Sequence, residues 1–151
     1  MLDYTREDWT TRAAALRLRN QAFIDGKFVD AASGRTFDSI NPANGAILTS
    51  VSECDAADVD HAVGVARRAF EDGRWSRMAP GDRKTVLLKL ADLVRANLEE
   101  MALLDSLDMG KLITDAVTID APGSAHFFQW YAECIDKIYD EVAPTGPGDL
   151  A

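Results

Sequence analysis

The stretch CDAADVDHAVGVARRAFEDGRWSRMAPGDRKTVLLKLADLVRANLEEMALLDSLDMGK, residues 54–111, decides the fold class, because it predicts three amphipathic helices in succession. Asp55 stands three residues before Asp58, the spacing of a capped helix start, and Gly73 ends this first helix. Pro80 and Asp82 suit the first turn of the second helix. Apolar residues recur at helical intervals in all three helices, at Val59, Ala62, Val63, Ala66, Ala69, Phe70, Leu87, Leu90, Ala91, Val94, Leu98, Met101, Ala102 and Leu104.

Asn97 divides the second of these helices from the third. It stands three residues before Glu100, which is the spacing of a capping box, so we expect Asn97 to cap the third helix. Gly110, in the closing run Asp108-Met109-Gly110-Lys111, is expected to end that helix.

Upstream, the sequence predicts one short helix and two pairs of strands. Thr5 and Asp8 have the spacing of a capped helix start. Asp25-Gly26 separates two short β-prone runs, which is a strong signal for a hairpin. Residues 36–40 and 47–52 predict two further strands on either side of the turn cluster at residues 41–45.

Downstream, residues 112–117 fit no element clearly, and a last long helix follows. Asp120 is expected to cap this helix and Pro122 to occupy its first turn, while Gly123 lets another backbone or a ligand come close. Its apolar residues recur at helical intervals to about Asp140, at Phe127, Phe128, Tyr131, Cys134, Ile135, Ile138 and Tyr139.

Length and composition indicate one ordinary globular domain. The chain has 151 residues, 47% of them hydrophobic, which is enough to bury a core. It contains neither an apolar run of membrane-spanning length nor a signal-peptide pattern at residues 1–8, so we expect a soluble, cytoplasmic protein that does not bind membranes. Cys54 and Cys134 lie far apart without paired spacing and are expected to be reduced thiols.

The net charge of −9 comes entirely from the last third of the chain. Acidic and basic residues balance in residues 1–98, whereas residues 99–151 contain Lys111 and Lys137 as their only basic residues. This acidic part argues against a nucleic acid or an anionic membrane as a partner. Its acidic side chains either form a solvated surface that keeps the protein soluble or produce a negative electrostatic potential that favours cationic substrates.

No catalytic or cofactor-binding residue can be placed from local chemistry. Cys54 precedes a helix, but its neighbours Glu53 and Asp55 disfavour a thiolate, and Cys134 lies on an apolar stripe and is expected in the core. His61 and His126 have no second ligand at metal-binding spacing, and no Gly-rich phosphate-binding motif occurs.

Several motifs in order nevertheless resemble a known family. They are Phe23-Ile24-Asp25-Gly26-Lys27-Phe28, Asn41-Pro42-Ala43-Asn44-Gly45, Ala66-Arg67-Arg68-Ala69-Phe70 with Trp75, Pro80 and Arg83, and Leu103 to Lys111. Together, from Ala22 to Pro144, they resemble the N-terminal part of the aldehyde dehydrogenase superfamily. Residues 119–123, 130–133, 135–137 and 141–143 look like the γ-glutamyl-γ-aminobutyraldehyde dehydrogenase branch.

The resemblance implies an α/β fold with β-hairpins first and a helical layer after them. Residues 1–20 would form an N-terminal helix, and residues 21–151 the N-terminal part of a dinucleotide-binding domain in a homo-oligomer. Family members oxidise an aldehyde to a carboxylic acid with NAD or NADP, through a thiohemiacetal on a cysteine, hydride transfer and thioester hydrolysis. Their nucleophile, base and main dinucleotide contacts come after the position of Pro144, so we expect this chain to be an N-terminal portion that is inactive alone.

The resemblance also implies two sites and a substrate class. A monovalent cation would bind at the carbonyls of Ser39 and Ile40 and the carboxylate of Asp108. Ile119, Asp120 and Gly123 would line the aldehyde entrance, where Asp120 attracts an amino group unless it serves only as a helix cap. The branch implies amino- or amido-aldehydes from polyamine breakdown. A non-catalytic assembly or interaction module derived from the same fold remains the alternative.

Overall fold

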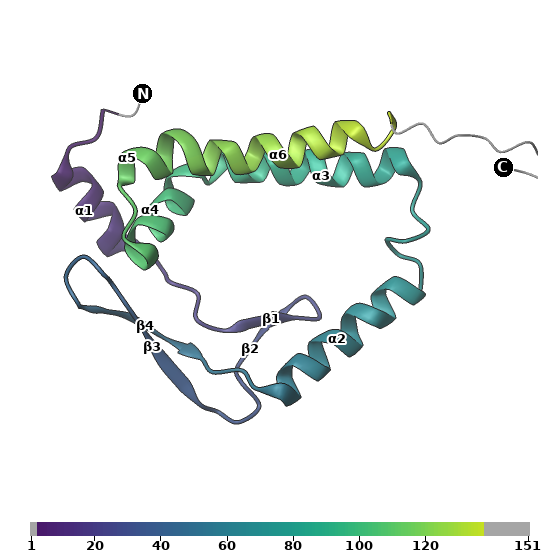
Figure 1. The fold of residues 1–151 in the computed structure, drawn as a ribbon, viewed down its shortest axis with the longest axis horizontal. Coiled ribbons are helices and arrows are strands. Elements are labelled where there is room, and N and C mark those ends of the chain that lie inside the picture. Colours follow the sequence, from purple (N-terminus) through teal and green to yellow (C-terminus); the bar gives the residue numbers. More distant parts are fainter. Residues whose placement is uncertain (1–2, 138–151) are drawn as a thin grey trace, which may run out of the picture.

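The computed structural model describes residues 3–137 (Figure 1). A short helix comes first, two hairpins follow, and helices make up the remainder. The helices are α1 (Arg6–Ala15), α2 (Ala56–Glu71), α3 (Pro80–Ala96), α4 (Leu98–Met109), α5 (Ile113–Asp115), the π-helical turn η1 (Ala116–Asp120) and α6 (Ala121–Cys134). The strands are β1 (Ala22–Ile24), β2 (Lys27–Val29), β3 (Thr36–Ile40) and β4 (Ile47–Ser52).

The four strands form two separate antiparallel hairpins. In the first, Ile24 pairs with Lys27, and Asp25 and Gly26 turn the chain with φ values of 54° and 75°. Two successive positive φ values are the mark of a type I′ turn, which confirms the Asp-Gly prediction. In the second, β3 pairs with β4 with an irregularity in register between Ser39 and Ile40.

Helix α2 begins with the predicted capping box. The Asp55 side chain accepts a hydrogen bond from the backbone of Ala57, and the Asp58 side chain accepts one from the backbone N–H of Asp55 at 3.0 Å. Asp58 is buried, and its other oxygen accepts a hydrogen bond from the Ala32 N–H at 2.9 Å. This carboxylate therefore joins the helix start to the hairpin region as well as capping it.

Helices α3 and α6 lie side by side along one edge of the molecule (Figure 1). Their buried residues are small, with Ala91 and Val94 on α3 and three alanines on α6: Ala121, Ala125 and Ala132. Such residues let two helix backbones approach closely. Lys84 at one end of the pair bonds Asp136 at 2.8 Å, which fixes the alignment of the two helices.

The junction between α3 and α4 corrects one prediction. Asn97 does end α3, but its side chain does not cap α4, and no capping box forms with Glu100. The Asn97 amide instead donates to the Leu93 carbonyl at 2.8 Å. The side chain thus bonds a carbonyl in the last turn of one helix, which also accepts the Asn97 N–H at 3.1 Å, rather than an open N–H at the start of the next helix.

The last helical segment starts earlier than the sequence suggests. Asp120 does not cap a helix, because α5 and η1 precede it and the chain is already helical from Ile113. In η1 the Ala121 N–H bonds the Ala116 carbonyl, a π-helical hydrogen bond. Helix α6 ends at Cys134 and residues 135–137 form a turn, so the predicted continuation to about Asp140 is wrong for these three residues, and residues 138–140 lie outside the described part of the chain.

The large apolar side chains are mostly exposed, and the core is built from small ones. Ala102, Ala116 and Ala121 form a buried cluster with Leu98, Met101, Ile113 and Val117 packed against it. Cys134, predicted in the core, is only half-buried. Exposed apolar side chains occur on both hairpins and on several helices, and those on α2, α3 and α6 include Val59, Val63, Phe70, Val86, Leu93, Phe127, Trp130 and Tyr131.

No helix in the described part of the chain has the length and apolar character needed to cross a membrane.

Candidate functional site

The residues predicted for a cation site come together. Ser39, Ile40 and Asp108 line one side of a cavity of about 810 Å³ between the β3–β4 hairpin and α4. The Ser39 hydroxyl donates to Oδ1 of Asp108 at 2.8 Å, although the two residues lie far apart in sequence. Ser39 and Asp108 therefore meet through the serine hydroxyl, whereas the predicted cation ligands are the carbonyls of Ser39 and Ile40 and the carboxylate of Asp108.

The turn after α4 fixes the position of Lys111. Gly110 has φ 74°, and its N–H bonds the Ser106 carbonyl at 3.2 Å, while the Ser106 hydroxyl donates to the Lys111 carbonyl at 2.8 Å. A Cβ added at Gly110 would lie 2.9 Å from Cγ of Pro42. The left-handed conformation and the close approach of Pro42 both require glycine here.

Asp120 forms an ion pair with Lys111. Nζ of Lys111 lies 2.5 Å from Oδ2 of Asp120, and about one third of each side chain is exposed. Hydrogen bonding to Asp120 raises the pKa of the Lys111 ammonium, and the charges of Asp120, Asp115 and Asp105 act in the same direction. Asp120 is thus neither a helix cap nor a free anion.

The other two residues predicted at the entrance, Ile119 and Gly123, are not enclosed by other described residues. Ile119 is 62% exposed. A Cβ added at Gly123 would meet nothing within 4 Å, so the described residues leave room at this position. Ile119, Asp120 and Gly123 all belong to the continuous segment formed by η1 and α6.

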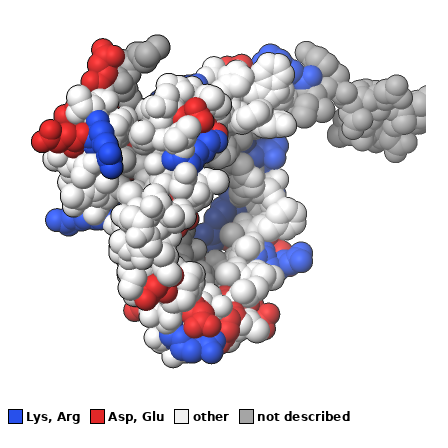
Figure 2. All heavy atoms as spheres, turned by 60° about the vertical axis from the view of Figure 1, so that its left-hand side comes forward, with Lys and Arg blue, Asp and Glu red and all other residues white. Residues whose placement is uncertain are grey.

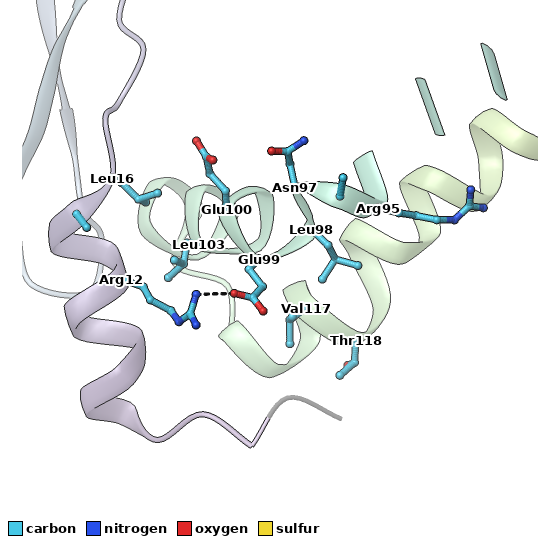
Figure 3. A pocket seen from close by; sticks show the side chains of 12 residues that line it. Arg12, Leu16, Arg95, Asn97, Leu98, Glu99, Glu100, Leu103, Val117 and Thr118 are labelled. Atoms are coloured by element: carbon cyan, nitrogen blue, oxygen red, sulfur yellow. Dashed lines mark hydrogen bonds and ion pairs between the residues drawn. The ribbon is translucent and has the colours of Figure 1, made fainter. Parts of the chain in front are cut away.

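A second cavity, of about 720 Å³, lies between α1, α4 and η1 (Figure 3). Arg12 of α1 points toward Glu99 of α4, and Nη1 lies 2.6 Å from Oε2. The Tyr4 hydroxyl donates to the other carboxylate oxygen at 3.2 Å. Leu98, Leu103 and Val117 supply apolar lining, and none of the predicted site residues lies here.

The described residues bring no nucleophile or metal cluster together. Cys54 is exposed, both cysteines are free thiols as predicted, and the two histidines are exposed on separate helices. In residues 3–137, no three His, Cys, Asp or Glu side chains lie close enough to hold a metal ion. On the face shown in Figure 2, acidic and basic side chains neighbour one another and wide uncharged areas separate them.

A family model described as the aldehyde dehydrogenase family matches residues 28–151, which is most of the chain. The chain belongs to the aldehyde dehydrogenase family. The hairpins and helices described above match part of the fold of its solved members. The sequence resemblance, carried by motifs from Ala22 onward, is confirmed.

Some of the similar proteins are dehydrogenases named for an amino- or amido-aldehyde substrate. An aminoacetaldehyde dehydrogenase of Pseudomonas aeruginosa is 52% identical over 147 residues, which are 97% of this chain and 30% of that protein. The NADP/NAD-dependent aldehyde dehydrogenase PuuC of Escherichia coli is 44% identical over 95% of this chain and 29% of its own length. The solved γ-glutamyl-γ-aminobutyraldehyde dehydrogenase of Burkholderia cenocepacia aligns with a TM-score of 0.90 at 48% identity, over 93% of this chain and 28% of its own.

The chain thus spans about 30% of the length of the curated relatives it matches. These comparisons support the branch suggested by residues 119–143, since a γ-glutamyl-γ-aminobutyraldehyde dehydrogenase is among the similar structures.

Sequence reasoning missed Lys111 as the partner of Asp120. Both residues lie in segments that carry the family resemblance. The π-helical turn that brings Asp120 to Lys111 has no distinct sequence pattern, so the pair could not be predicted from it. The acidic excess of residues 99–151 could have indicated an ion pair at Lys111, because this part of the chain contains two lysines and many carboxylates.

Proposed function

We propose that this chain is the N-terminal portion of an NAD(P)-dependent aldehyde dehydrogenase that oxidises amino- or amido-aldehydes to carboxylic acids in polyamine breakdown. The observation that carries the proposal is the 52% identity, over nearly the whole chain, to an aminoacetaldehyde dehydrogenase. The similarity to a γ-glutamyl-γ-aminobutyraldehyde dehydrogenase points to the same class of substrate, an aldehyde with a nitrogen group at its far end.

The domain assignment follows from the same relationship. We propose that residues 1–20, which include helix α1 (Arg6–Ala15), form an N-terminal segment and that residues 21–151 belong to the dinucleotide-binding domain of a homo-oligomeric, cytoplasmic enzyme. The exposed apolar faces of α2 and α6 support this assignment, because a protein rarely leaves so much large apolar surface in water. The remaining two thirds of the enzyme would cover those faces.

Ile119, Asp120 and Gly123 are proposed to border the aldehyde entrance. Support comes from the exposure of Ile119, the open space beside Gly123, and the π-helical turn that carries Asp120, since such turns are frequent at functional sites. Gly123 would leave room for a long or bulky aldehyde.

A monovalent cation is proposed at Ser39, Ile40 and Asp108. The donors are oxygen atoms of a carboxylate, a hydroxyl and backbone carbonyls, which suit a hard cation, and Ser39 Oγ lies 2.8 Å from Asp108 Oδ1. In the full-length enzyme, replacing K⁺ by tetramethylammonium should lower the Tm of the native protein and leave the Tm of Asp108→Asn unchanged. An equal shift in both proteins would remove the site.

The sequence has no Gly-rich strand-to-helix turn of the kind that cradles a dinucleotide phosphate. We propose that the main NAD(P) contacts come from other parts of the enzyme. NAD(P) would accept the hydride from the aldehyde carbon, and this chain contributes walls of the site rather than reacting groups.

The proposed function is tested on the full-length protein that contains this chain. Purified protein should reduce NAD⁺ or NADP⁺ with 3-aminopropanal, and the 151-residue chain alone should not. If the full-length protein oxidises no aldehyde with either dinucleotide, the alternative, a non-catalytic assembly or interaction module, would be favoured. Turnover by the isolated chain that disappears in Cys54→Ser or Cys134→Ser would show that a thiol of this chain is the nucleophile.

A further inference from the structure

Lys111 is a single cation among several carboxylates. Apart from Lys137, it is the one basic residue from residue 99 onward. Three carboxylates surround it closely enough to affect its ionisation: Asp105, Asp115 and Asp120. Only Asp120 lies within ion-pair distance, with its Oδ2 2.5 Å from Nζ of Lys111.

Both partners of this pair are held by backbone structure. Lys111 follows the left-handed residue Gly110, and its carbonyl accepts the Ser106 hydroxyl. Asp120 ends the π-helical turn η1, which packs on α4 through the buried contact of Ala116 with Ala102. The backbone is therefore fixed at both partners, and Asp120 has a short side chain, so forming this ion pair orders fewer groups than a pair between two long surface side chains.

The Asp120 carboxylate depends on Lys111 for its neutralisation. Oδ2 of Asp120 is buried, and in the described part of the chain the Lys111 ammonium is the one cation within ion-pair distance of it. Removing the ammonium would leave Asp120 as an uncompensated anion, with Asp115 and Asp105 nearby.

We propose that Lys111 is a specificity-determining residue, which neutralises Asp120 and so sets the charge that an aldehyde meets at the entrance. The inference rests on the proposed function, because it takes Asp120 as an entrance residue. With Lys111 in place, the pair is neutral and an amino-aldehyde gains little from Asp120. Without Lys111, the carboxylate attracts a cationic substrate and repels an anionic one.

The test compares three short aldehydes of different charge in the full-length enzyme: 3-aminopropanal as the cation, butanal as the neutral compound and 4-oxobutanoate as the anion. The variants are Lys111→Gln, which removes the charge, and Lys111→Arg, which keeps it. Asp120→Asn removes the opposite charge and leaves Lys111 uncompensated. Thermal unfolding of each variant establishes that it is folded before its kinetics are compared.

Lys111→Gln should increase the ratio of kcat/KM for 3-aminopropanal to kcat/KM for 4-oxobutanoate by roughly three- to tenfold, mainly through KM. Asp120→Asn should decrease the same ratio and Lys111→Arg should leave it near the native value, while kcat/KM for butanal should change by a smaller factor than kcat/KM for either charged aldehyde. Because the effect is electrostatic, 0.5 M NaCl should reduce it.

The outcomes separate this inference from the function on which it rests. Native enzyme that oxidises no aldehyde overturns both. Native enzyme that oxidises aldehydes, with an unchanged charge ratio in folded Lys111→Gln, overturns the role of Lys111 alone. If Lys111→Gln does not fold, Asp120→Asn decides: an unchanged or increased ratio in that variant overturns the inference.

Discussion

At the scale of single residues, the buried carboxylate of Asp58 is the clearest case of a side chain with two structural tasks. Hydrogen bonds from the backbone N–H groups of Asp55 and Ala32 lower the pKa of Asp58 below its ordinary value of 3.8. A carboxylate with a lowered pKa in the folded state stabilises the fold above the unfolded pKa. This contribution is lost as the pH falls through the lower, folded pKa.

We therefore expect Asp58→Asn to unfold more easily than the native chain at pH 7 and to show a weaker loss of stability below pH 4. Urea unfolding followed by circular dichroism between pH 7 and pH 2.5 measures both effects. Asp60→Asn, which removes an exposed carboxylate from the same helix, is the matched control and should keep the native pH profile. Equal profiles for the two variants would contradict the role assigned to Asp58.

Predictions for single residues were confirmed where the residue and its partner lie close together in sequence. Asp25-Gly26 and the pair Asp55 and Asp58 formed the expected turn and capping box, because their partners lie within three residues. Asn97 and Asp120 were both predicted as caps, and both predictions were wrong. Each side chain had a competing partner, the Leu93 carbonyl for Asn97 and the Lys111 ammonium for Asp120, and no local pattern ranks such competitors.

At the scale of elements, the contact between α3 and α6 depends on alanine. Ala91 and Ala132 are fully buried, and Ala125 almost so. A larger side chain at any of these positions must push the two helices apart or adopt a strained rotamer, and overpacking of this kind typically costs about 1–3 kcal/mol.

Ala132→Leu should accordingly lower the free energy of unfolding by about 1–3 kcal/mol in urea titration. The control is Phe127→Leu on the same helix, whose side chain is 63% exposed in the chain and should matter little to its stability. A neutral Ala132→Leu would mean that the two helices pack less closely than described.

The same contact explains what the sequence could predict about the elements. Apolar periodicity located the long helices, but it missed α5 and η1 and did not identify the face of α6 that packs. The aromatic residues Phe127, Phe128 and Tyr131 dominate the predicted stripe and are exposed here, while the alanines, which carry little hydropathy signal, form the contact. Periodicity identifies a helix and not the partner for each of its faces.

At the scale of the whole molecule, the described residues leave many large apolar side chains exposed. No large side chain is fully buried in the described residues, whereas Phe23, Phe70 and Leu112 are each more than 60% exposed. Water around such surface is displaced when two copies associate, so the isolated chain should self-associate.

Sedimentation velocity of the isolated 151-residue chain over a range of concentrations should show species larger than 16.5 kDa, together with strong binding of a hydrophobic dye. The full-length enzyme provides the control, since its remaining parts should cover these faces and reduce dye binding per chain. A monomer at all concentrations with little dye binding would contradict the proposal that this chain is part of a larger fold.

The π-helical turn η1 has a consequence for insertions and deletions. A π-turn contains one residue more than an α-turn, so removing one residue from η1 would restore a regular α-helix without breaking the segment. Each residue of an α-helix advances by about 100° around its axis, so residues on the two sides of the deletion would change their relative orientation by about that angle. A deletion among residues 116–119 lies between Lys111 and Asp120, so Asp120 stays with α6 when Ala121 and Ala125 keep their buried positions, and the segment that leads back to Lys111 must rearrange. Related enzymes that lack one residue here are therefore expected to separate the two charges of this ion pair while the contact between α3 and α6 is unchanged.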